Sequence, residues 1–169
     1  MNRGLLVPDE LVAKMLEARF DRADIEKGFI LDGYPRNLSQ AKTLDEILAK
    51  RKLDIGMVFY LDTSDNVIIQ RLAGRLVCKA CAANFHIKNM PPKKKGICDH
   101  CGARLYQRKD DQETTVKKRL EVYKKEAASL IGFYEGKQTL YRLSADAEPK
   151  LVLKQIIEIA LKCDDSLKV

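Results

Sequence analysis

The sequence predicts an α/β protein in which helices flank a parallel sheet and a small metal-binding insertion interrupts the chain. Short apolar runs alternate with amphipathic segments, and this alternation is typical of parallel sheets covered by helices on both faces. Two cysteine pairs, each with C-x2-C spacing, lie near the middle of the chain and indicate a small metal site. The length of 169 residues suits one domain with an insertion.

Two apolar runs that end in aspartate are expected to form buried strands. These runs are residues 28–32 (GFILD) and residues 57–62 (MVFYLD). In open parallel sheets, ligands bind beyond the carboxyl ends of the strands. We therefore expect Asp32 and Asp62 to lie at the binding edge of the sheet. A third short strand is expected at residues 140–143.

Helices are expected around these strands because apolar residues recur there with helical spacing. The first helix follows Pro8 and carries acidic residues in its first turn, where they face the positive end of the helix dipole. Ser64 is expected to cap another helix, which Gly74 closes. Further helices are expected from Ser39, from Thr114 or Thr115, and over residues 151–161. The side chains expected to face the core from these helices are Leu11, Val12, Met15, Leu16, Leu44, Ile47, Leu48, Val67, Ile68, Leu72, Val116, Leu120, Tyr123, Ala127, Leu130 and Ile131.

The charge balance restricts the possible partners. The chain has 31 basic and 24 acidic residues and a formal net charge of +7, which favours polyanions, either nucleic acids or nucleoside phosphates. No apolar run approaches the roughly 18 residues that a membrane-spanning helix needs. The apolar part of the N-terminal segment is too short for a signal peptide. We expect a cytoplasmic protein with no membrane partner.

The four paired cysteines are expected to hold one structural zinc ion. Each C-x2-C turn directs two thiolates at one point, and two such turns complete a closed tetrahedral shell without a position for a catalytic water. A disulfide is the weaker alternative in a reducing cytosol. His86 and His100 are alternative ligands, although four cysteines already satisfy the metal. The expected ligands are Cys78, Cys81, Cys98 and Cys101.

The insertion between the cysteine pairs has too few apolar residues for a core of its own. Residues 78–101 are rich in lysine and contain two prolines and two asparagines, so we expect the metal to supply the stability that a core would otherwise give. The fifth cysteine, Cys163, follows the apolar pattern of the last helix and is expected to be a small buried hydrophobic residue.

Five arginines are placed where they could surround phosphate groups. Arg71 and Arg75 are four residues apart and share one helix face. A guanidinium group can bind two phosphate oxygens at once through two hydrogen bonds, and it stays charged at any relevant pH. Both properties suit phosphoryl transfer. The alternative is that these are ordinary surface arginines with carboxylate partners, and spacing does not decide between the two. The arginines are Arg36, Arg71, Arg75, Arg108 and Arg119.

Several stretches, in order along the chain, carry a resemblance to a known family. They are residues 28–36 (GFILDGYPR) with Gln40, residues 71–75 (RLAGR), the two cysteine turns, residues 105–111 (LYQRKDD), and residues 115–120 (TVKKRL). Together they make the chain similar to an adenylate kinase of the zinc-bearing, long-lid type.

The resemblance implies a fold and an activity. The fold would be a P-loop-kinase-type parallel sheet with a zinc-stapled lid. The activity would be reversible transfer of the terminal phosphoryl group of ATP to AMP, with Mg²⁺, giving two molecules of ADP. Residues 1–75 would be a partial AMP-binding segment and core, residues 76–107 the zinc-binding lid, and residues 108–169 core. ATP, AMP and ADP would be its ligands, without nucleic acid, and the chain would be a monomer.

The resemblance also implies roles for individual residues. Asp32 would anchor the water shell of Mg²⁺, and Asp110 and Asp111 would orient the lid arginines. The residues implied to bind AMP are Leu5, Leu6, Val7, Gly33, Arg36, Gln40, Arg108 and Arg119, with Arg36 on the phosphate and Gln40 on the adenine edge. The residues implied to bind ATP are Arg71, Arg75, Asn84 and Phe85. The residues implied to act in catalysis are Arg36, Arg71, Arg75, Arg108, Arg119 and Asp32.

The sequence departs from the family at the phosphate-binding loop. Adenylate kinases open with a strand and a loop close to G-x-x-x-x-G-K-S/T, and the 169 residues contain no such motif. The family pattern begins at residues 4–7, so we expect an N-terminally truncated chain. The missing first central strand should leave apolar strand edges unpaired. Without the amides and lysine of the loop, this chain alone is expected to be inactive or weak.

Other functions remain compatible with the residues. The basic insertion suits a zinc ribbon that binds nucleic acid, although such modules stack bases on aromatic side chains, and here only Phe85 and the neighbouring Tyr106 are available. A catalytically dead scaffold derived from the kinase is another possibility. Related kinases accept UMP, CMP or GMP, whereas the zinc lid and Gln40 favour AMP.

Overall fold

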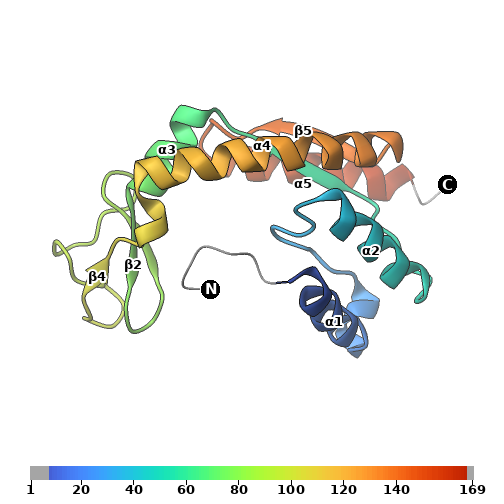
Figure 1. The fold of residues 1–169 in the computed structure, drawn as a ribbon, viewed down its shortest axis with the longest axis horizontal. Coiled ribbons are helices and arrows are strands. Elements are labelled where there is room, and N and C mark those ends of the chain that lie inside the picture. Colours follow the sequence, from blue (N-terminus) through green and yellow to red (C-terminus); the bar gives the residue numbers. More distant parts are fainter. Residues whose placement is uncertain (1–7, 167–169) are drawn as a thin grey trace. The chain divides into compact units, whose positions relative to one another are not determined.

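The computed structural model describes residues 8–166, with side chains described as far as Cys163. The chain forms two compact units. Unit 1 contains Met1–Tyr60, Lys124–Leu143 and Leu153–Val169, and unit 2 contains Leu61–Tyr123 and Ser144–Val152. Figure 1 shows the order of the elements along the chain.

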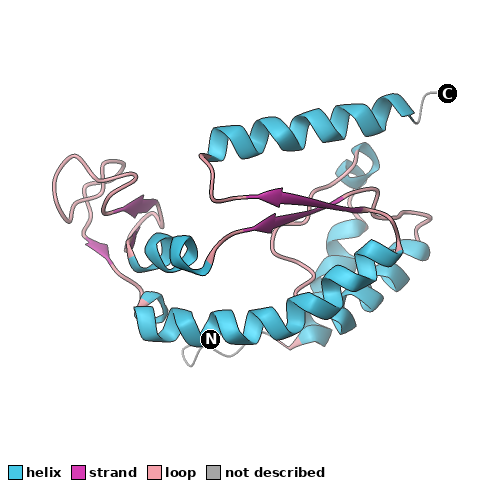
Figure 2. Ribbon diagram, turned by 90° about the horizontal axis from the view of Figure 1, so that it is seen from above, coloured by secondary structure: helices cyan, strands magenta, loops and turns pink. Residues whose placement is uncertain are grey.

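Unit 1 contains most of the helices and the parallel sheet. Its helices are α1 (Asp9–Phe20), the short 3-10 helix η1 (Ala23–Lys27), α2 (Leu38–Ala49), the second part of α4 (Glu113–Gly136) and most of α5 (Pro149–Ser166). Strands β1 (Val58–Asp62) and β5 (Leu140–Ser144) form a two-stranded sheet. They run parallel, as the arrows in Figure 2 show, because Val58 pairs with Thr139 at one end and Ala145 pairs with Asp62 at the other.

The predicted class, an α/β fold with helices flanking a parallel sheet, is confirmed. The predicted helices from residues 9, 39, 64, 114 and 151 correspond to α1, α2, α3, α4 and α5, each within a few residues. The strand predicted at residues 140–143 is β5. The strand predicted at residues 57–62 is β1, but its side chains are half-buried or exposed instead of buried.

The strand predicted at residues 28–32 is wrong, because this segment has no regular structure. A strand needs a neighbour to bond its backbone, and no described strand pairs with this segment. Phe29 and Leu31 pack against the core of unit 1, and Phe29 lies 4.9 Å from Phe20 between ring centroids. Ile30 points away and is 95% exposed. The side chains of this segment therefore alternate between core and solvent, as in an extended chain, although the segment belongs to no sheet.

The core of unit 1 lies where α1 and α2 pack together. Leu44, Ile47 and Leu48 are buried on one face of α2, as predicted, together with Phe20 and Ile25. The expected stripe of α1 is partly wrong. Leu11 and Met15 are exposed, while Ala13 and Leu16 pack against this core, because the inward face of α1 is set by Phe20 at its end.

Two further expectations about helices are corrected. Tyr123 on α4 is exposed, whereas Val116 and Ala127 on the same helix are buried as expected. Cys163 is half-buried instead of buried, and its Sγ lies 3.0 Å from the hydroxyl of Tyr141. A polar partner on β5 therefore replaces the purely apolar surroundings that were expected for this cysteine.

Unit 2 contains the predicted insertion. Helix α3 (Asp65–Ala73) leads into strand β2 (Arg75–Cys78), which is the central strand of a three-stranded antiparallel sheet with β3 (Asn84–His86) and β4 (Leu105–Tyr106). The 3-10 helix η2 (Lys109–Asp111) and the first part of α4 follow. The small core of this sheet combines Phe85 with Cys78 and Cys98, and Leu76 and Leu105 pack against it.

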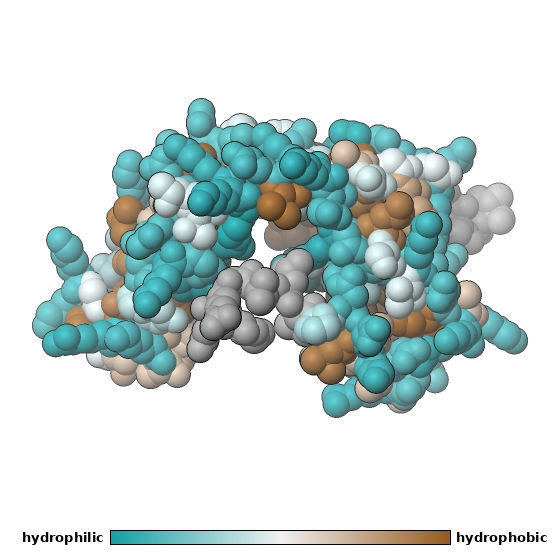
Figure 3. Space-filling model, viewed as in Figure 1, coloured by the Kyte–Doolittle hydropathy of each residue, from teal (hydrophilic) through white to brown (hydrophobic). Residues whose placement is uncertain are grey.

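On the face drawn in Figure 3, brown patches are separated by hydrophilic residues. The exposed large apolar side chains include Leu153, Ile157 and Leu161, which recur every four residues along α5. In the described part of the chain, no helix is both long and apolar enough to cross a membrane.

Gly74, at the junction of α3 and β2, is required for a reason that differs from the predicted one. Its φ of −91° is not the left-handed conformation of a typical helix-closing glycine. Instead, a Cβ at this position would lie 2.2 Å from Nε2 of His86. The imidazole cannot move aside easily, because its Nδ1 accepts hydrogen bonds from the amides of Lys88 and Asn89, and its Nε2 faces the carbonyl of Gln70 at 3.1 Å.

We therefore predict that Gly74→Ala destabilises unit 2 by about 1–3 kcal/mol, since the added methyl overpacks a fixed ring. Gly132→Ala on α4 is the matched control, because a Cβ there meets no atom within 4 Å. That control should be stabilising by about 0.5–1 kcal/mol, because alanine is the better helix former. Urea denaturation followed by circular dichroism measures both. Equal effects of the two substitutions would contradict this account of Gly74.

Candidate functional site

The four paired cysteines of unit 2 converge on one point. Their sulfur atoms all lie within 4.8 Å of one another. Cys78 and Cys101 are 3.4 Å apart between sulfurs, Cys81 and Cys98 are 3.6 Å apart, and Cys81 and Cys101 are 3.5 Å apart. A disulfide would require about 2.0 Å, and all four cysteines are free.

These distances fit a tetrahedral metal site. With metal–sulfur bonds of about 2.3 Å, the sulfurs of a four-thiolate zinc site are about 3.8 Å apart. The observed separations of 3.4, 3.6 and 3.5 Å are close to this value. Among the described residues, the group that could hold a metal ion consists of these four cysteines. The four thiols therefore fit a closed structural site.

The two cysteine turns have the same backbone construction. In the first, the amide of Cys78 donates to the carbonyl of Ala83, and Ala82 donates back to the carbonyl of Cys78. In the second, Cys98, Gly102 and Ala103 repeat these two bonds. The fifth residue of each turn has a positive φ, 58° at Ala82 and 74° at Gly102. This geometry aims both sulfurs of each turn inward.

The thiols interact electrostatically before any metal binds. The backbone amide of Cys81, and then that of Ala80, stabilise the thiolate of Cys78 and lower its pKa to about 6. The amide of Ala103 likewise acts to lower the pKa of Cys101. The hydrogen bonds between the Cys101 thiol and the sulfurs of Cys78 and Cys81 outweigh this effect and raise the pKa of Cys101 to about 12.

Neither His86 nor His100 belongs to the group of candidate metal ligands. The ring of His86 is held by Gln70, Lys88 and Asn89, as described above. The ring of His100 packs against Phe85, with 5.8 Å between ring centroids. The four-cysteine set is therefore the arrangement that the structure favours over a set that includes histidine.

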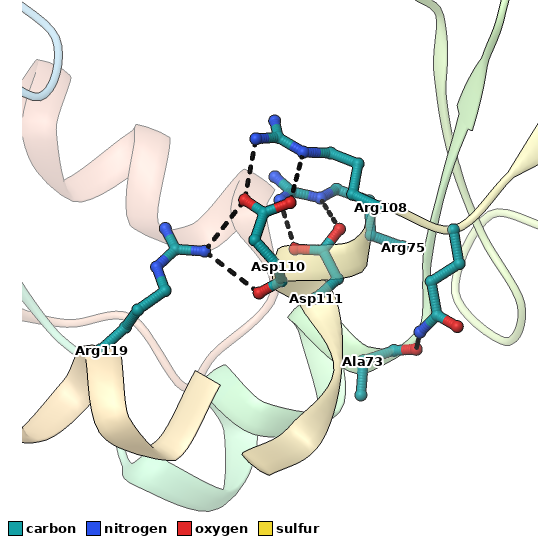
Figure 4. Close-up of polar contacts among 7 residues, drawn as sticks. Ala73, Arg75, Arg108, Asp110, Asp111 and Arg119 are labelled. Carbon is teal, nitrogen blue, oxygen red and sulfur yellow. Dashed lines mark hydrogen bonds and ion pairs between the residues drawn. The ribbon is translucent and has the colours of Figure 1, made fainter. Parts of the chain in front are cut away.

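A second cluster in unit 2 joins arginines to two adjacent aspartates (Figure 4). Arg75, at the start of β2, binds Asp111 of η2 through two hydrogen bonds of 2.9 and 2.5 Å. The side chain of Asp111 is fully buried. The hydrogen bond to Asp111 raises the pKa of Arg75 above its usual value, against the effect of burial. Loss of this carboxylate would leave a part-buried guanidinium without its partner, at a cost of about 1–3 kcal/mol.

Asp110 lies between two further arginines. Arg108 binds it through two hydrogen bonds of 2.9 and 2.8 Å, and Arg119 on α4 approaches it at 3.4 Å. Burial acts to raise the pKa of Asp110, but the hydrogen bonds from Arg108 and the charges of Arg108 and Arg119 outweigh burial, so this pKa lies below its usual value. These arginines are more than one-third exposed, so the contacts are weak and exchangeable.

Arg71 lies on α3 in the same unit, where its contact is the carbonyl of Ala147 at 3.4 Å. Three of the predicted arginines, Arg75, Arg108 and Arg119, therefore share the two carboxylates of Asp110 and Asp111. Their cluster keeps an excess of positive charge, which is the condition for binding an anion.

A third group of predicted residues lies in unit 1. Arg36 donates from Nε to the carbonyl of Gly33 at 2.8 Å, and its backbone amide donates to Oε1 of Gln40, also at 2.8 Å. Within the described residues, the terminal nitrogens of Arg36 have no carboxylate partner. Asp32 is exposed, and it too has no ion-pair partner in that part of the chain. One free carboxylate suits Mg²⁺, which keeps most of its waters.

The other predicted site residues differ in their exposure to solvent. Asn84 is exposed on β3, but Phe85 is buried in the small core of unit 2. Leu5, Leu6 and Val7 lie outside the described residues. Sequence reasoning missed Asp9, whose carboxylate accepts a 2.7 Å hydrogen bond from Nε2 of Gln40. No local pattern signals this contact, because the two residues are 31 positions apart.

An α/β core with a four-cysteine unit that also carries clustered arginines is the arrangement expected of a nucleoside monophosphate kinase. Comparison with known proteins identifies the family. Residues 1–139 match the family model for adenylate kinase, and the chain belongs to the adenylate kinase family. It is 44% identical to an adenylate kinase of Caldicellulosiruptor saccharolyticus over 158 residues, which are 94% of this chain and 74% of that relative.

Other relatives agree with this assignment. An adenylate kinase of Acholeplasma laidlawii is 43% identical over 94% of this chain and 73% of its own length. One of Methanosarcina acetivorans is 43% identical over 96% of this chain and 75% of its own length. The predicted family is thus confirmed, and the fold of the described chain is consistent with a P-loop kinase.

Because unit 2 has so small a core, we predict that removing the metal unfolds its three-stranded sheet. Protein purified under reducing conditions should contain about one zinc per chain, and a strong chelator should abolish hydrogen-exchange protection of the Leu76 and Phe85 amides. Cys78→Ser should bind far less metal, whereas the control Cys163→Ser should bind as much as the unmodified protein. Metal-free protein with the sheet intact would contradict the prediction.

Proposed function

We propose that the protein is an adenylate kinase that transfers the terminal phosphoryl group of ATP to AMP. In this reaction the bond between the γ-phosphorus and the bridging β,γ-oxygen breaks, and a bond forms between the γ-phosphorus and an oxygen of the AMP phosphate. Two ADP molecules result, and the reverse step regenerates ATP and AMP. The observation that carries the proposal is the local cluster in which three guanidinium groups, those of Arg75, Arg108 and Arg119, share the two carboxylates of Asp110 and Asp111. Phosphoryl transfer depends on such charge neutralisation and on positioning.

The AMP side of the site is proposed to use residues of unit 1. Arg36 binds the AMP phosphate with its terminal nitrogens, which have no carboxylate partner among the described residues. Gly33 holds the Nε of Arg36 through its carbonyl, and Gln40 reads the edge of the adenine. We propose that residues 5–7 line the same base pocket.

The ATP side is proposed to use unit 2. The weak contacts of Arg108 and Arg119 with Asp110 can be exchanged for contacts with phosphate, so these two arginines serve both nucleotides. Arg75 is held by buried Asp111 and contributes its charge from a fixed position. Arg71, with Asn84 and Phe85, completes the proposed ATP side.

The ion that accompanies ATP in this family is Mg²⁺, which supplies charge neutralisation at the phosphates when bound. We propose that Asp32 hydrogen-bonds to its water shell. Closed thiolate coordination makes the zinc proposed for the four cysteines structural, so no reaction step passes through it.

The absence of a G-x-x-x-x-G-K-S/T motif in the 169 residues limits the proposed rate. Such a loop surrounds the β- and γ-phosphates with backbone amides and a lysine. Loss of one electrostatic donor of this kind lowers rates by about 10²–10³. We therefore propose that the 169-residue chain binds nucleotides but transfers phosphoryl groups weakly by itself.

The test combines calorimetric binding of AMP and ATP with a coupled assay for ADP formation. We predict binding of both nucleotides, with turnover far below ordinary kinase rates. Arg119→Ala should weaken ATP binding about tenfold, because one charge-assisted contact is lost. Arg19→Ala is the matched control, since Arg19 pairs with exposed Asp24 outside the proposed site. Binding to a random oligonucleotide that nucleotides cannot displace would contradict the kinase proposal and favour a nucleic-acid-binding protein.

A further inference from the structure

The side-chain amide of Gln40 is held between two groups of opposite hydrogen-bonding character. Its Nε2 donates to a carboxylate oxygen of Asp9 at 2.7 Å, and its Oε1 accepts from the backbone amide of Arg36 at 2.8 Å. Asp9 begins α1, Arg36 lies in the turn before α2, and Gln40 lies in the first turn of α2. Gln40 is only 5% exposed, so its amide is enclosed as well as bonded.

These two partners determine which way the amide faces. A carboxylate without a proton can only accept a hydrogen bond, and a backbone N–H can only donate one. The NH2 group of Gln40 must therefore face Asp9, and its oxygen must face Arg36. A flipped amide would place oxygen against carboxylate and NH2 against N–H. Both contacts would then be repulsive at hydrogen-bonding distance.

Asp9 is also tied to the residue that caps α2. The Nδ2 of Asn37 approaches the second carboxylate oxygen of Asp9 at 3.5 Å, and the Oδ1 of Asn37 accepts from the backbone amide of Gln40 at 2.8 Å. Asp9 thus holds both the side chain of Gln40 and the cap that sets its backbone.

We propose that Asp9 is a positioning residue that sets the base preference of the monophosphate site by preventing the Gln40 amide from flipping. This inference rests on the proposed function, in which Gln40 faces the edge of the base. After its contacts with Asp9 and Arg36, Gln40 retains one N–H and one oxygen lone pair, side by side and in a fixed order.

Adenine and guanine present opposite patterns to such a pair. The edge of adenine offers the acceptor N1 beside the donor N6–H, whereas the edge of guanine offers the donor N1–H beside the acceptor O6. A free amide can flip and match either base. An amide that cannot flip matches one pattern only, and a buried mismatch leaves polar groups without partners. Cytosine shares the pattern of adenine, whereas uracil shares that of guanine.

The test exchanges the two partners while preserving their shapes. In Gln40→Glu, a carboxylate faces Asp9, so we expect a lower melting temperature than in the unmodified chain. In the double variant D9N/Q40E, the amide introduced at position 9 can donate to the carboxylate introduced at position 40, so the melting temperature should recover. That carboxylate would then present only acceptors to the base, and the ratio of AMP to GMP affinity should fall at least about tenfold. Asp9→Asn alone offers Gln40 a donor as well as an acceptor, which permits a flipped Gln40 amide on this side, so the ratio of AMP to GMP affinity should fall. A single D9N variant that keeps the original ratio would overturn the role proposed for Asp9.

Asp24→Asn is the matched control, because Asp24 pairs with Arg19 and has no contact with Gln40. Calorimetry with AMP and GMP gives the affinities, and thermal denaturation gives the stabilities. The proposal is overturned if D9N does not restore the stability lost in Q40E, or if the double variant keeps the original AMP to GMP ratio. An unmodified chain that binds neither monophosphate would overturn the proposed function, and with it the base preference, while the stability comparison would still report on the Asp9–Gln40 contact.

Discussion

Mutual repulsion among the arginines of unit 2 is the constraint on which the candidate site depends. Two adjacent carboxylates offset it in different ways. Asp111 is fully buried and holds Arg75 through two hydrogen bonds, which joins the start of β2 to η2. Asp110 is part-exposed and shares its charge between Arg108 and Arg119. One aspartate therefore fixes an arginine, and the next holds two arginines in contacts that a phosphate can replace.

An ion held by the four cysteines would let the chain carry this charge on a unit with few apolar residues. Unit 2 buries little beyond Phe85 and two of the cysteines themselves. Cross-linking of these two similarly built turns by one ion would give such a unit rigidity that apolar burial cannot supply. The ring of Phe85 packs with Cys78 and Cys98 in this small core instead of standing free on the surface.

Local features of this chain could be predicted from the sequence, whereas features that depend on distant partners could not. The C-x2-C spacing is enough to predict the two cysteine turns. The helical periodicity of Leu44, Ile47 and Leu48 identifies the buried face of α2. Residues 28–32 have the composition of a strand, but a strand exists only beside a neighbour, and none of the described strands pairs with them. Asp9 could be recognised only as a favourable residue for a helix start, because its contact with Gln40 joins positions far apart in sequence.

The central claim is that arginines of unit 2 bind nucleotide phosphates, whereas Arg75 stays bound to Asp111 and does not exchange this partner for phosphate. Nuclear magnetic resonance of the arginine Nε–H groups during titration with ATP tests this claim most directly. The account predicts that the signals of Arg71, Arg108 and Arg119 shift with saturation, while the signal of Arg75 changes little. Saturating ATP that leaves all four signals unchanged, or that shifts only the signal of Arg75, would contradict it.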